Sequence, residues 1–148
     1  MRRNGLIFVL LGIVAVAIIL PRFRGVAPTP QVFDEGWTLT EAKVESASSA
    51  KPVLALLTAD WCPPCQQLKR GALSDSKVAA AIKERTIPVY VDVDHAAQDA
   101  QQFANIRSIP TMVLQVGDEE VGRVTGVVGA GELLRWLDET LARVPDDE

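Results

Sequence analysis

The chain has two cysteines, Cys62 and Cys65, and they stand three residues apart within the letters WCPPC at 61–65. An ionised thiol attacks disulfides, and a dithiol that closes into a disulfide gives up two electrons. The same spacing also fits a buried structural pair or part of a zinc site. A structural zinc site needs about four ligands, and His95 is the one other good ligand in the sequence. The residues favour dithiol redox chemistry and leave these two alternatives open.

The segments around the cysteines predict that Cys62 lies where a buried strand gives way to a helix. The letters VLALLT at 53–58 form a continuous apolar run, which is typical of a strand buried on both faces. A helix is expected to begin at the cysteine motif and to end near Arg70, before Gly71. The dipole and the free N–H groups of a helix N-terminus favour an anion, so this position activates a thiol.

The two prolines between the cysteines fit the start of this helix. Pro63 and Pro64 would occupy its first two positions, where a missing N–H breaks no helical hydrogen bond. The backbone N–H of Cys65 is then the first donor left for the Cys62 sulfur. One turn of helix also brings Cys65 back beside Cys62, close enough for a disulfide.

The rest of the chain alternates helical and extended patterns. Before the strand 53–58 we expect a helix from Thr38 or Thr40 to about Ser49. After the cysteine helix we expect a helix capped by Ser74 with Val78, Ala79 and Ile82 on one face, then a strand at 87–94, and then a helix from Ala96 to about Asn105. The chain is expected to end with a hairpin of strands 111–116 and 120–125 around Gly117-Asp118, followed by a last helix with Leu133, Leu134, Leu137 and Leu141 on one face. Strands that alternate with helices pair in parallel, and a hairpin adds antiparallel strands. The sequence therefore predicts an α/β fold with a central mixed four-stranded sheet flanked by helices.

The N-terminus combines two arginines with the apolar run Leu6–Leu20. These 15 residues would span ~22 Å as a helix, against ~30 Å for a hydrocarbon core, and they also fit the apolar region of a signal peptide. Arg22 and Arg24 can lengthen an anchor by snorkelling, and Pro28 disfavours cleavage after the small residues before it. We expect an N-terminal hydrophobic helix at 1–24 that anchors the protein in the membrane; a cleaved signal peptide and a buried core helix are the alternatives.

Composition divides the remaining chain into a linker and a domain. Residues 25–35 are rich in proline and predict an extended linker, and residues 36–145 are expected to form the folded domain. After Arg24 the chain carries 11 basic and 19 acidic residues, a net charge of −8. Nucleic-acid binding needs a basic surface that neutralises phosphates, so we expect no nucleic-acid partner.

Two stretches of this sequence resemble a known active site. The letters ADWCPPC at 59–65 are similar to the active-site motif of the thioredoxin superfamily, and IRSIPT at 106–111 resembles its cis-proline loop. The resemblance covers about residues 36–144. Within the superfamily, 51–65 and the letters LSDSKV at 73–78 look most like the C-terminal domain of the membrane thiol:disulfide interchange reductases. Membrane-tethered thioredoxins of cytochrome c maturation are the next most similar.

The resemblance implies a role for each matching residue. Cys62 is the attacking thiol, Cys65 is the resolving thiol, and together they form a redox-active disulfide. Pro110 is expected to be cis, although Ile-Pro-Thr is by itself compatible with a simple strand start. The backbone of Ile109 is expected to pair with an extended substrate segment. The expected substrate-binding residues are Trp61, which should also shield the cysteines on one side, and Ile109, Pro110, Thr111 and Gly126.

The sequence departs from the superfamily pattern behind the cysteines. The superfamily usually carries a buried aspartate six residues before the first cysteine, and its lysine partner stands on the next strand. Here these positions are Leu56 and Tyr90. The usual proton-handling group is therefore missing, and Asp60 is the acid nearest to the cysteines in sequence.

These observations predict a thiol:disulfide oxidoreductase that uses a Cys-Pro-Pro-Cys dithiol. It is expected to need no organic cofactor and no metal, and its partners are protein thiols or disulfides and a redox partner. By analogy we expect it to act as a reductant, anchored to the membrane with its domain in the periplasm or at the cell surface. The alternatives are a disulfide oxidant or isomerase, a non-catalytic thioredoxin-like binding module, and a secreted form released by signal cleavage.

Overall fold

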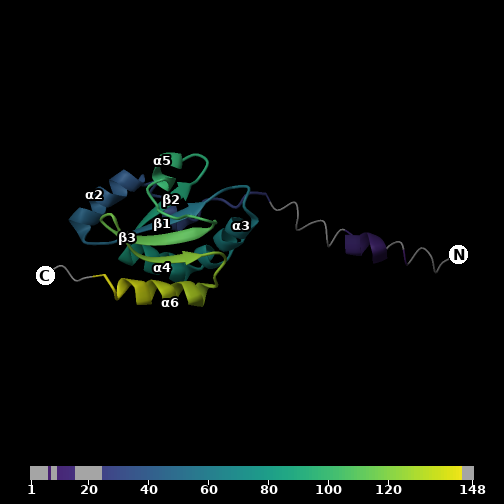
Figure 1. The fold of residues 1–148 in the computed structure, drawn as a ribbon. Coiled ribbons are helices and arrows are strands. Elements are labelled where there is room, and N and C mark those ends of the chain that lie inside the picture. The colour runs from purple at the N-terminus through teal and green to yellow at the C-terminus, as the bar shows by residue number, and fades with distance from the viewer. Residues whose placement is uncertain (1–6, 8–9, 16–24, 145–148) are drawn as a thin grey trace.

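The computed structural model of the chain describes residues 7, 10–15 and 25–144 (Figure 1). Ile7 and residues 10–15 are helical and exposed, and most of the expected hydrophobic segment 1–24 falls outside the described residues. Within the described part of the chain, no helix has both the length and the apolar character needed to cross a membrane. The N-terminal anchor therefore stays a prediction.

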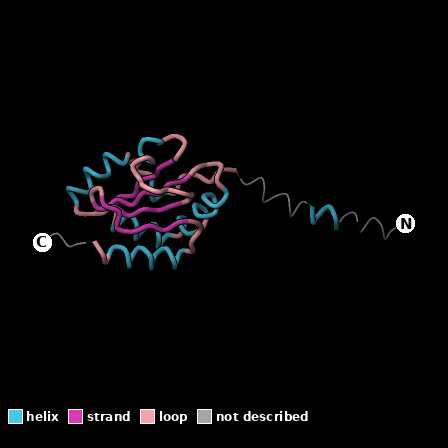
Figure 2. Tube along the Cα trace, viewed as in Figure 1, coloured by secondary structure: helices cyan, strands magenta, loops and turns pink. Residues whose placement is uncertain are grey.

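A sheet forms the centre of the domain (Figure 2). Its four strands lie in the order β2-β1-β3-β4. The first strand in sequence, β1 (Val53–Thr58), pairs in parallel with β2 (Ile87–Asp92) on one side. On its other side it pairs antiparallel with β3 (Thr111–Val116), and β4 (Glu119–Thr125) completes the hairpin. The expected mixed sheet with an antiparallel hairpin is confirmed.

Helices cover both faces of this sheet (Figure 1). The elements on one face are α3 (Pro63–Arg70), α4 (Ser76–Arg85), α6 (Ala130–Leu141) and the short 3-10 segments η2 (Gln31–Phe33) and η3 (Ala72–Ser74). The other face carries α2 (Leu39–Ser49) and the short α5 (Ala97–Ala100). Thr38 caps α2 in a capping box with Glu41, as its spacing predicts.

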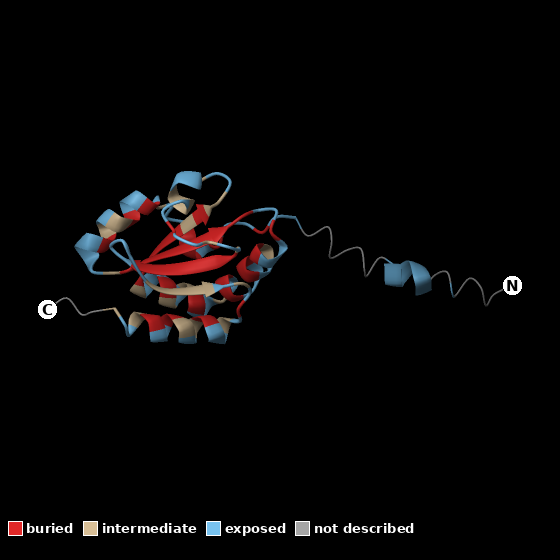
Figure 3. Ribbon diagram, viewed as in Figure 1, coloured by how far each residue is buried: buried red, intermediate tan, exposed pale blue. Residues whose placement is uncertain are grey.

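The apolar run of β1 is continuous because the sheet is buried on both faces. Leu54 and Leu56 point into the core beneath α3, α4 and α6, whereas Val53, Ala55 and Leu57 point into the core beneath α2. Figure 3 shows the central strands as buried and the helices as buried only on their inner sides. The cysteine helix α3 therefore begins at the end of a fully packed strand.

Two helices differ from the expectation. The cap of α4 is Asp75 and not Ser74, because the Ser74 hydroxyl donates to the Lys69 carbonyl within the preceding turn. The helix expected from Ala96 to Asn105 is reduced to the single turn α5. The chain then continues in i to i+3 turns and reaches Asn105 in the left-handed region with φ 58°, which bends it toward the loop before β3.

Residues 25–33, here called the N-terminal strap, lie against the domain. Val32 and Phe33 are buried in the core beneath α4, and Ala27 is buried near α3. The Ala27 N–H donates to the Gln66 side chain at 2.5 Å. The hydrophobic core thus takes up residues that precede position 36, where the sequence suggested the domain begins.

Candidate active site

Cys62 is the N-cap of α3, and its sulfur faces the helix N-terminus. Its Sγ accepts a hydrogen bond from the backbone N–H of Cys65 at 3.3 Å. Pro63 and Pro64 occupy the first two helical positions, so the expected arrangement of donors is present. The sulfur therefore lies where a thiolate is stabilised by a backbone donor and by the helix dipole.

The two cysteines form a disulfide, with their Cα atoms 5.2 Å apart. Cys62 is 3% exposed and Cys65 is 1% exposed, so both cysteines are buried. Ala59, Val93 and Ile109 supply the apolar cover of the pair. The roles of Cys62 as the attacking thiol and Cys65 as the resolving thiol stay predictions.

The loop before β3 passes directly over Cys62. The Cys62 Sγ lies 3.6 Å from the Ile109 carbonyl oxygen, and the Ile109–Pro110 peptide bond is cis. The Gly126 N–H donates to the Pro110 carbonyl at 2.8 Å, and the Thr111 hydroxyl donates to the Ser108 carbonyl at 2.8 Å. The structure thus brings four residues expected from the sequence into one loop cluster beside the disulfide.

Trp61 projects from this cluster and is 69% exposed. Its indole N–H donates to the Asp94 carboxylate at 2.6 Å, in the loop after β2. Asp92 caps that loop by accepting from the N–H groups of Asp94 and His95. Burial opposes the ionisation of Asp92, but hydrogen bonds from Asp94 and His95 outweigh it and lower its pKa. Trp61 is therefore held at the rim, and residues other than Trp61 provide the apolar cover of the cysteines.

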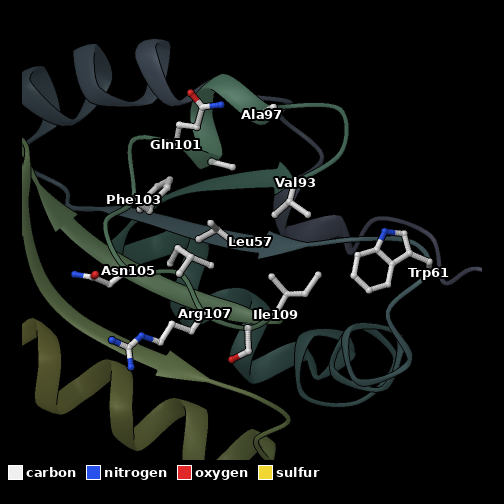
Figure 4. Close-up of a pocket in the computed structure, with 12 residues that line it drawn as sticks. Leu57, Trp61, Val93, Ala97, Gln101, Phe103, Asn105, Arg107 and Ile109 are labelled. Atoms are coloured by element: carbon white, nitrogen blue, oxygen red, sulfur yellow. The ribbon is translucent and has the colours of Figure 1, made fainter.

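A groove of about 620 Å³ lies beside the cis-proline loop, between that loop and α5 (Figure 4). Apolar side chains form most of its lining, with Arg107 and Gln101 among the polar ones. The apolar lining residues include Leu57, Val93, Phe103, Ile106 and Ile109. Trp61, which directly precedes Cys62 in the sequence, stands at one end of this groove (Figure 4). The arrangement offers a reactive sulfur next to an apolar surface and an exposed aromatic ring.

Comparison with known proteins identifies this arrangement. The family described as the thioredoxin-like domain matches the chain over residues 39–141, which is more than half of its length. The chain belongs to the thioredoxin-like domain family. The expected enzyme class is confirmed for this domain, which is a thioredoxin-like thiol:disulfide oxidoreductase domain with its close cysteine pair in a disulfide.

Relatives of two kinds share this thioredoxin-like domain. Thioredoxin C-3 of Corynebacterium nephridii is 35% identical over 96 residues, which are 64% of this chain and 62% of that protein. The thiol:disulfide interchange protein DsbD of Actinobacillus pleuropneumoniae is 28% identical over 99 residues, or 64% of this chain and 17% of DsbD. A thioredoxin from Thermus thermophilus, solved in solution, has a TM-score of 0.61 at 28% identity and covers 70% of this chain and 83% of its own. The chain thus matches about three fifths of one relative and less than a fifth of another.

An arginine that the sequence did not single out fixes the far side of the groove. Arg123 on β4 donates to the carbonyls of Ala104 and Asn105 at 2.8 and 3.1 Å. It also pairs with the Glu120 carboxylate, and the hydrogen bonds and the charge of Glu120 raise the pKa of Arg123. The sequence of β4 does not predict these hydrogen bonds, because a charged residue is common on an edge strand. The carbonyls that accept them belong to a distant turn, which lies next to Arg123 only in the folded domain.

The region behind the cysteines is apolar at the position singled out by the sequence. Leu56 is fully buried and lies opposite Tyr90 in the parallel register of β1 and β2. A second residue missed by sequence reasoning lies there as well. Lys69 of α3 is buried, with its ammonium 5.1 Å from the centre of the Tyr90 ring. The thioredoxin-like domain therefore has a buried lysine beside Tyr90, and the helix α3 supplies it.

Proposed function

We propose that the protein is a membrane-tethered reductant of protein disulfides that acts outside the cytoplasm through its Cys-Pro-Pro-Cys dithiol. The observation that carries this proposal is the position of the Cys62 sulfur. It caps α3, accepts a hydrogen bond from Cys65, and lies beside the cis-proline loop at an apolar groove. This combination supports attack on a disulfide held in an extended protein segment.

The reaction begins with the reduced dithiol. The Cys62 thiolate attacks one sulfur of the substrate disulfide, which forms a mixed disulfide and releases the other substrate sulfur as a thiolate. The Cys65 thiolate then attacks Cys62 and displaces the second substrate sulfur. The substrate gains two electrons, and the protein is left with the Cys62–Cys65 disulfide seen in the structure. A redox partner must reduce this disulfide before the next cycle; the exchange itself uses no metal and no organic cofactor.

The substrate is proposed to add along the cis-proline loop as an extended segment. The backbone of Ile109 lies next to the Cys62 sulfur, so a segment paired there would present its disulfide to that sulfur. Trp61 and the apolar side chains of the groove would contact the neighbouring residues of the substrate. Such contacts favour unfolded or flexible protein substrates, whose backbone is free to pair.

Different observations favour the proposed direction of electron transfer and the proposed location of the domain. Reduction is favoured by the resemblance of residues 51–65 to the C-terminal domain of the membrane interchange reductases. An extracytoplasmic domain is favoured by the apolar run Leu6–Leu20, by its flanking arginines, and by the absence of acids from residues 1–24.

Insulin reduction coupled to dithiothreitol tests the activity of the full-length protein in detergent. Turnover that depends on Cys62 supports the proposal, and absence of turnover would favour a non-catalytic binding module. Titration of the dithiol against glutathione or dithiothreitol tests the direction. Known potentials run from about −270 mV for thioredoxin to about −120 mV for strong oxidants. A value near the lower end supports a reductant, and one near the upper end would replace it with an oxidant.

Fusions and fractionation test the location. A reporter that is active only outside the cytoplasm is expected to work when fused after Arg24. The protein is expected to stay with membranes in high salt and to dissolve in detergent. A soluble product that begins near Pro28 would contradict the anchor and support a cleaved signal peptide.

A further inference from the structure

Lys69 is buried although it is charged, and its ammonium faces the start of the cysteine helix. Its side chain is 1% exposed, and its Nζ lies 3.3 Å from the Asp60 Oδ1. Lysine is almost never fully buried unless it is paired, because water solvates its charge strongly. Asp60 is 55% exposed, so solvent screens the carboxylate of this pair much more than the ammonium.

The lysine reaches this place from the same helix face as the resolving cysteine. Lys69 stands one helical turn after Cys65, and both residues are buried. Long side chains on a helix lean toward its N-terminus, which carries the Lys69 ammonium back toward the cysteine motif. Asp60, its partner, stands two residues before Cys62. The ammonium therefore lies toward the N-terminal part of α3, beside the residue that precedes the Trp61-Cys62 start of the cysteine motif.

Nearby groups leave this ammonium with a single carboxylate partner among the described residues. The Tyr90 ring of β2 lies under it, at 5.1 Å from Nζ to the ring centre, and an ammonium over an aromatic face is favourable. Leu56 lies opposite Tyr90 and brings no charge. Asp94, the acid of the loop after β2, is hydrogen-bonded to the Trp61 indole.

The N-terminal strap lies beside this site. Lys69 and Arg70 line one side of a cleft whose other side is the strap, from Ala27 to Val32. The strap is held there by hydrogen bonds from the Ala27 N–H to Gln66 and from Arg70 to the Gly25 carbonyl. The Gln66 amide also donates to the Asp60 carbonyl at 3.1 Å, in the cysteine loop. A low local dielectric strengthens the field of a buried charge, so the Lys69 ammonium is screened less than the ammonium of an exposed lysine.

We infer that Lys69 is a positioning residue whose buried ammonium favours the thiolate of Cys62, with Asp60 as a partly offsetting counter-charge. A thiolate favoured in the reduced protein makes the dithiol state more stable and the disulfide more oxidising. The inference rests on the dithiol exchange of the proposed function but not on its direction or location. Lys69 touches no substrate; it acts through the charge that it places behind the cysteines.

The test compares Lys69→Met with Lys83→Met in the full-length protein in detergent. Methionine replaces the buried lysine by an apolar chain of similar length, and the Asp60 carboxylate left without its partner is 55% exposed, so water can solvate it. Lys83 of α4 is the matched control, because its Nζ pairs with the Asp34 Oδ1 at 2.8 Å, away from the cysteines. The readouts are the rate of Cys62 alkylation against pH and the equilibrium of the dithiol with glutathione. Both are measured without a protein substrate.

Lys69→Met is expected to slow alkylation at pH 6 by about tenfold and to move the profile to higher pH. It is also expected to shift the glutathione equilibrium toward the disulfide by about tenfold, which corresponds to about 30 mV. Lys83→Met is expected to leave both readouts unchanged. Equal profiles for Lys69→Met and the wild type would overturn the inference.

Two further variants decide the matter if Lys69→Met does not fold. Asp60→Asn removes the offsetting carboxylate and is expected to speed alkylation at pH 6, whereas Lys69→Arg keeps the charge and is expected to keep the wild-type profile. An unchanged profile in Asp60→Asn would overturn the inference. A wild-type protein that fails to reduce insulin while Lys69→Met still shifts the alkylation profile would contradict the proposed function and support the role of Lys69.

Discussion

Helices α3 and α4 lie on the same face of the sheet and begin in contrasting ways. The Asp75 carboxylate caps α4 and accepts two backbone N–H groups, from Lys77 at 2.8 Å and Val78 at 3.2 Å. The Cys62 sulfur caps α3 and accepts one, from Cys65 at 3.3 Å. The Asp75 oxygen accepts from both N–H groups that a helix offers its cap. The Cys62 sulfur accepts from one of them.

Proline at the second helical position explains the difference. An N-cap side chain accepts from the second or third residue of its helix, and both donors are present in α4. In α3 the second residue is Pro64, which has no N–H, so Cys65 is left as the donor. The site thus keeps the field of a helix N-terminus while limiting how strongly that terminus binds the sulfur.

The largest expected effect follows from replacing the sulfurs themselves. Cys62→Ser keeps a capping oxygen and is expected to abolish insulin reduction and to trap almost no substrate. Cys65→Ser removes the resolving thiol, so substrates are expected to remain bound to Cys62 as mixed disulfides. The measurement is recovery of covalent adducts on non-reducing gels. Equal trapping by both variants, or trapping by Cys62→Ser alone, would show that the two roles are assigned wrongly.

The next effect concerns the apolar surroundings of α3. Resolution requires Cys65 to lose its proton, which burial opposes, and Leu56 offers no base. We expect the release of substrate thiol from a preformed Cys62 mixed disulfide to be slow at pH 6–7. The rate is expected to rise nearly tenfold per pH unit until Cys65 titrates, because the thiolate is the attacking form.

Leu56→Asp is expected to flatten this profile by supplying a base, with a loss of about 1–3 kcal/mol in the free energy of unfolding from burying a polar group. Leu56→Asn is its matched control, since it buries a similar shape without a base and is expected to keep the steep profile. A wild-type rate that is already flat between about pH 6 and 8 would show that another base serves the pair, with Asp60 the first to test.

The start of α3 could be predicted from the sequence because its determinants are local. The apolar run of β1, the prolines and the spacing of the cysteines place the Cys62 sulfur at the helix N-terminus without reference to the rest of the chain. The pairing of β1 with β2 and of the hairpin could be predicted for a similar reason, since it follows from the order of the elements.

Features that depend on distant contacts could not be predicted in this way. Lys69 has the sequence signature of an exposed helical residue, and its burial results from Asp60, Tyr90 and the N-terminal strap. The helix expected to end near Asn105 is shortened because that segment must turn toward the cis-proline loop, where Arg123 holds its carbonyls. In both cases the decisive partner lies far away in the sequence.

A smaller effect is expected from restoring the missing donor of α3. Pro64→Ala returns an N–H at the second helical position, where Asp75 finds its donor in α4. A second hydrogen bond to the sulfur favours the thiolate, so Cys62 alkylation at pH 6 is expected to become about three to ten times faster. Pro63→Ala is the matched control, because an N–H at the first position does not serve the cap. Equal rates for both variants would show that Pro64 does not limit the cap.

The smallest effect on the chemistry is expected at the other cap. Asp75→Ala removes the acceptor for Lys77 and Val78 and is expected to lower the free energy of unfolding by about 1 kcal/mol. Asp75→Asn keeps a capping oxygen and is expected to lose much less. Urea unfolding measures both, while alkylation of Cys62 and insulin reduction are expected to match the wild type. Slower alkylation in Asp75→Ala would mean that the N-terminus of α4 contributes to the electric field at the Cys62 sulfur. The N-termini of α3 and α4 would then not act independently.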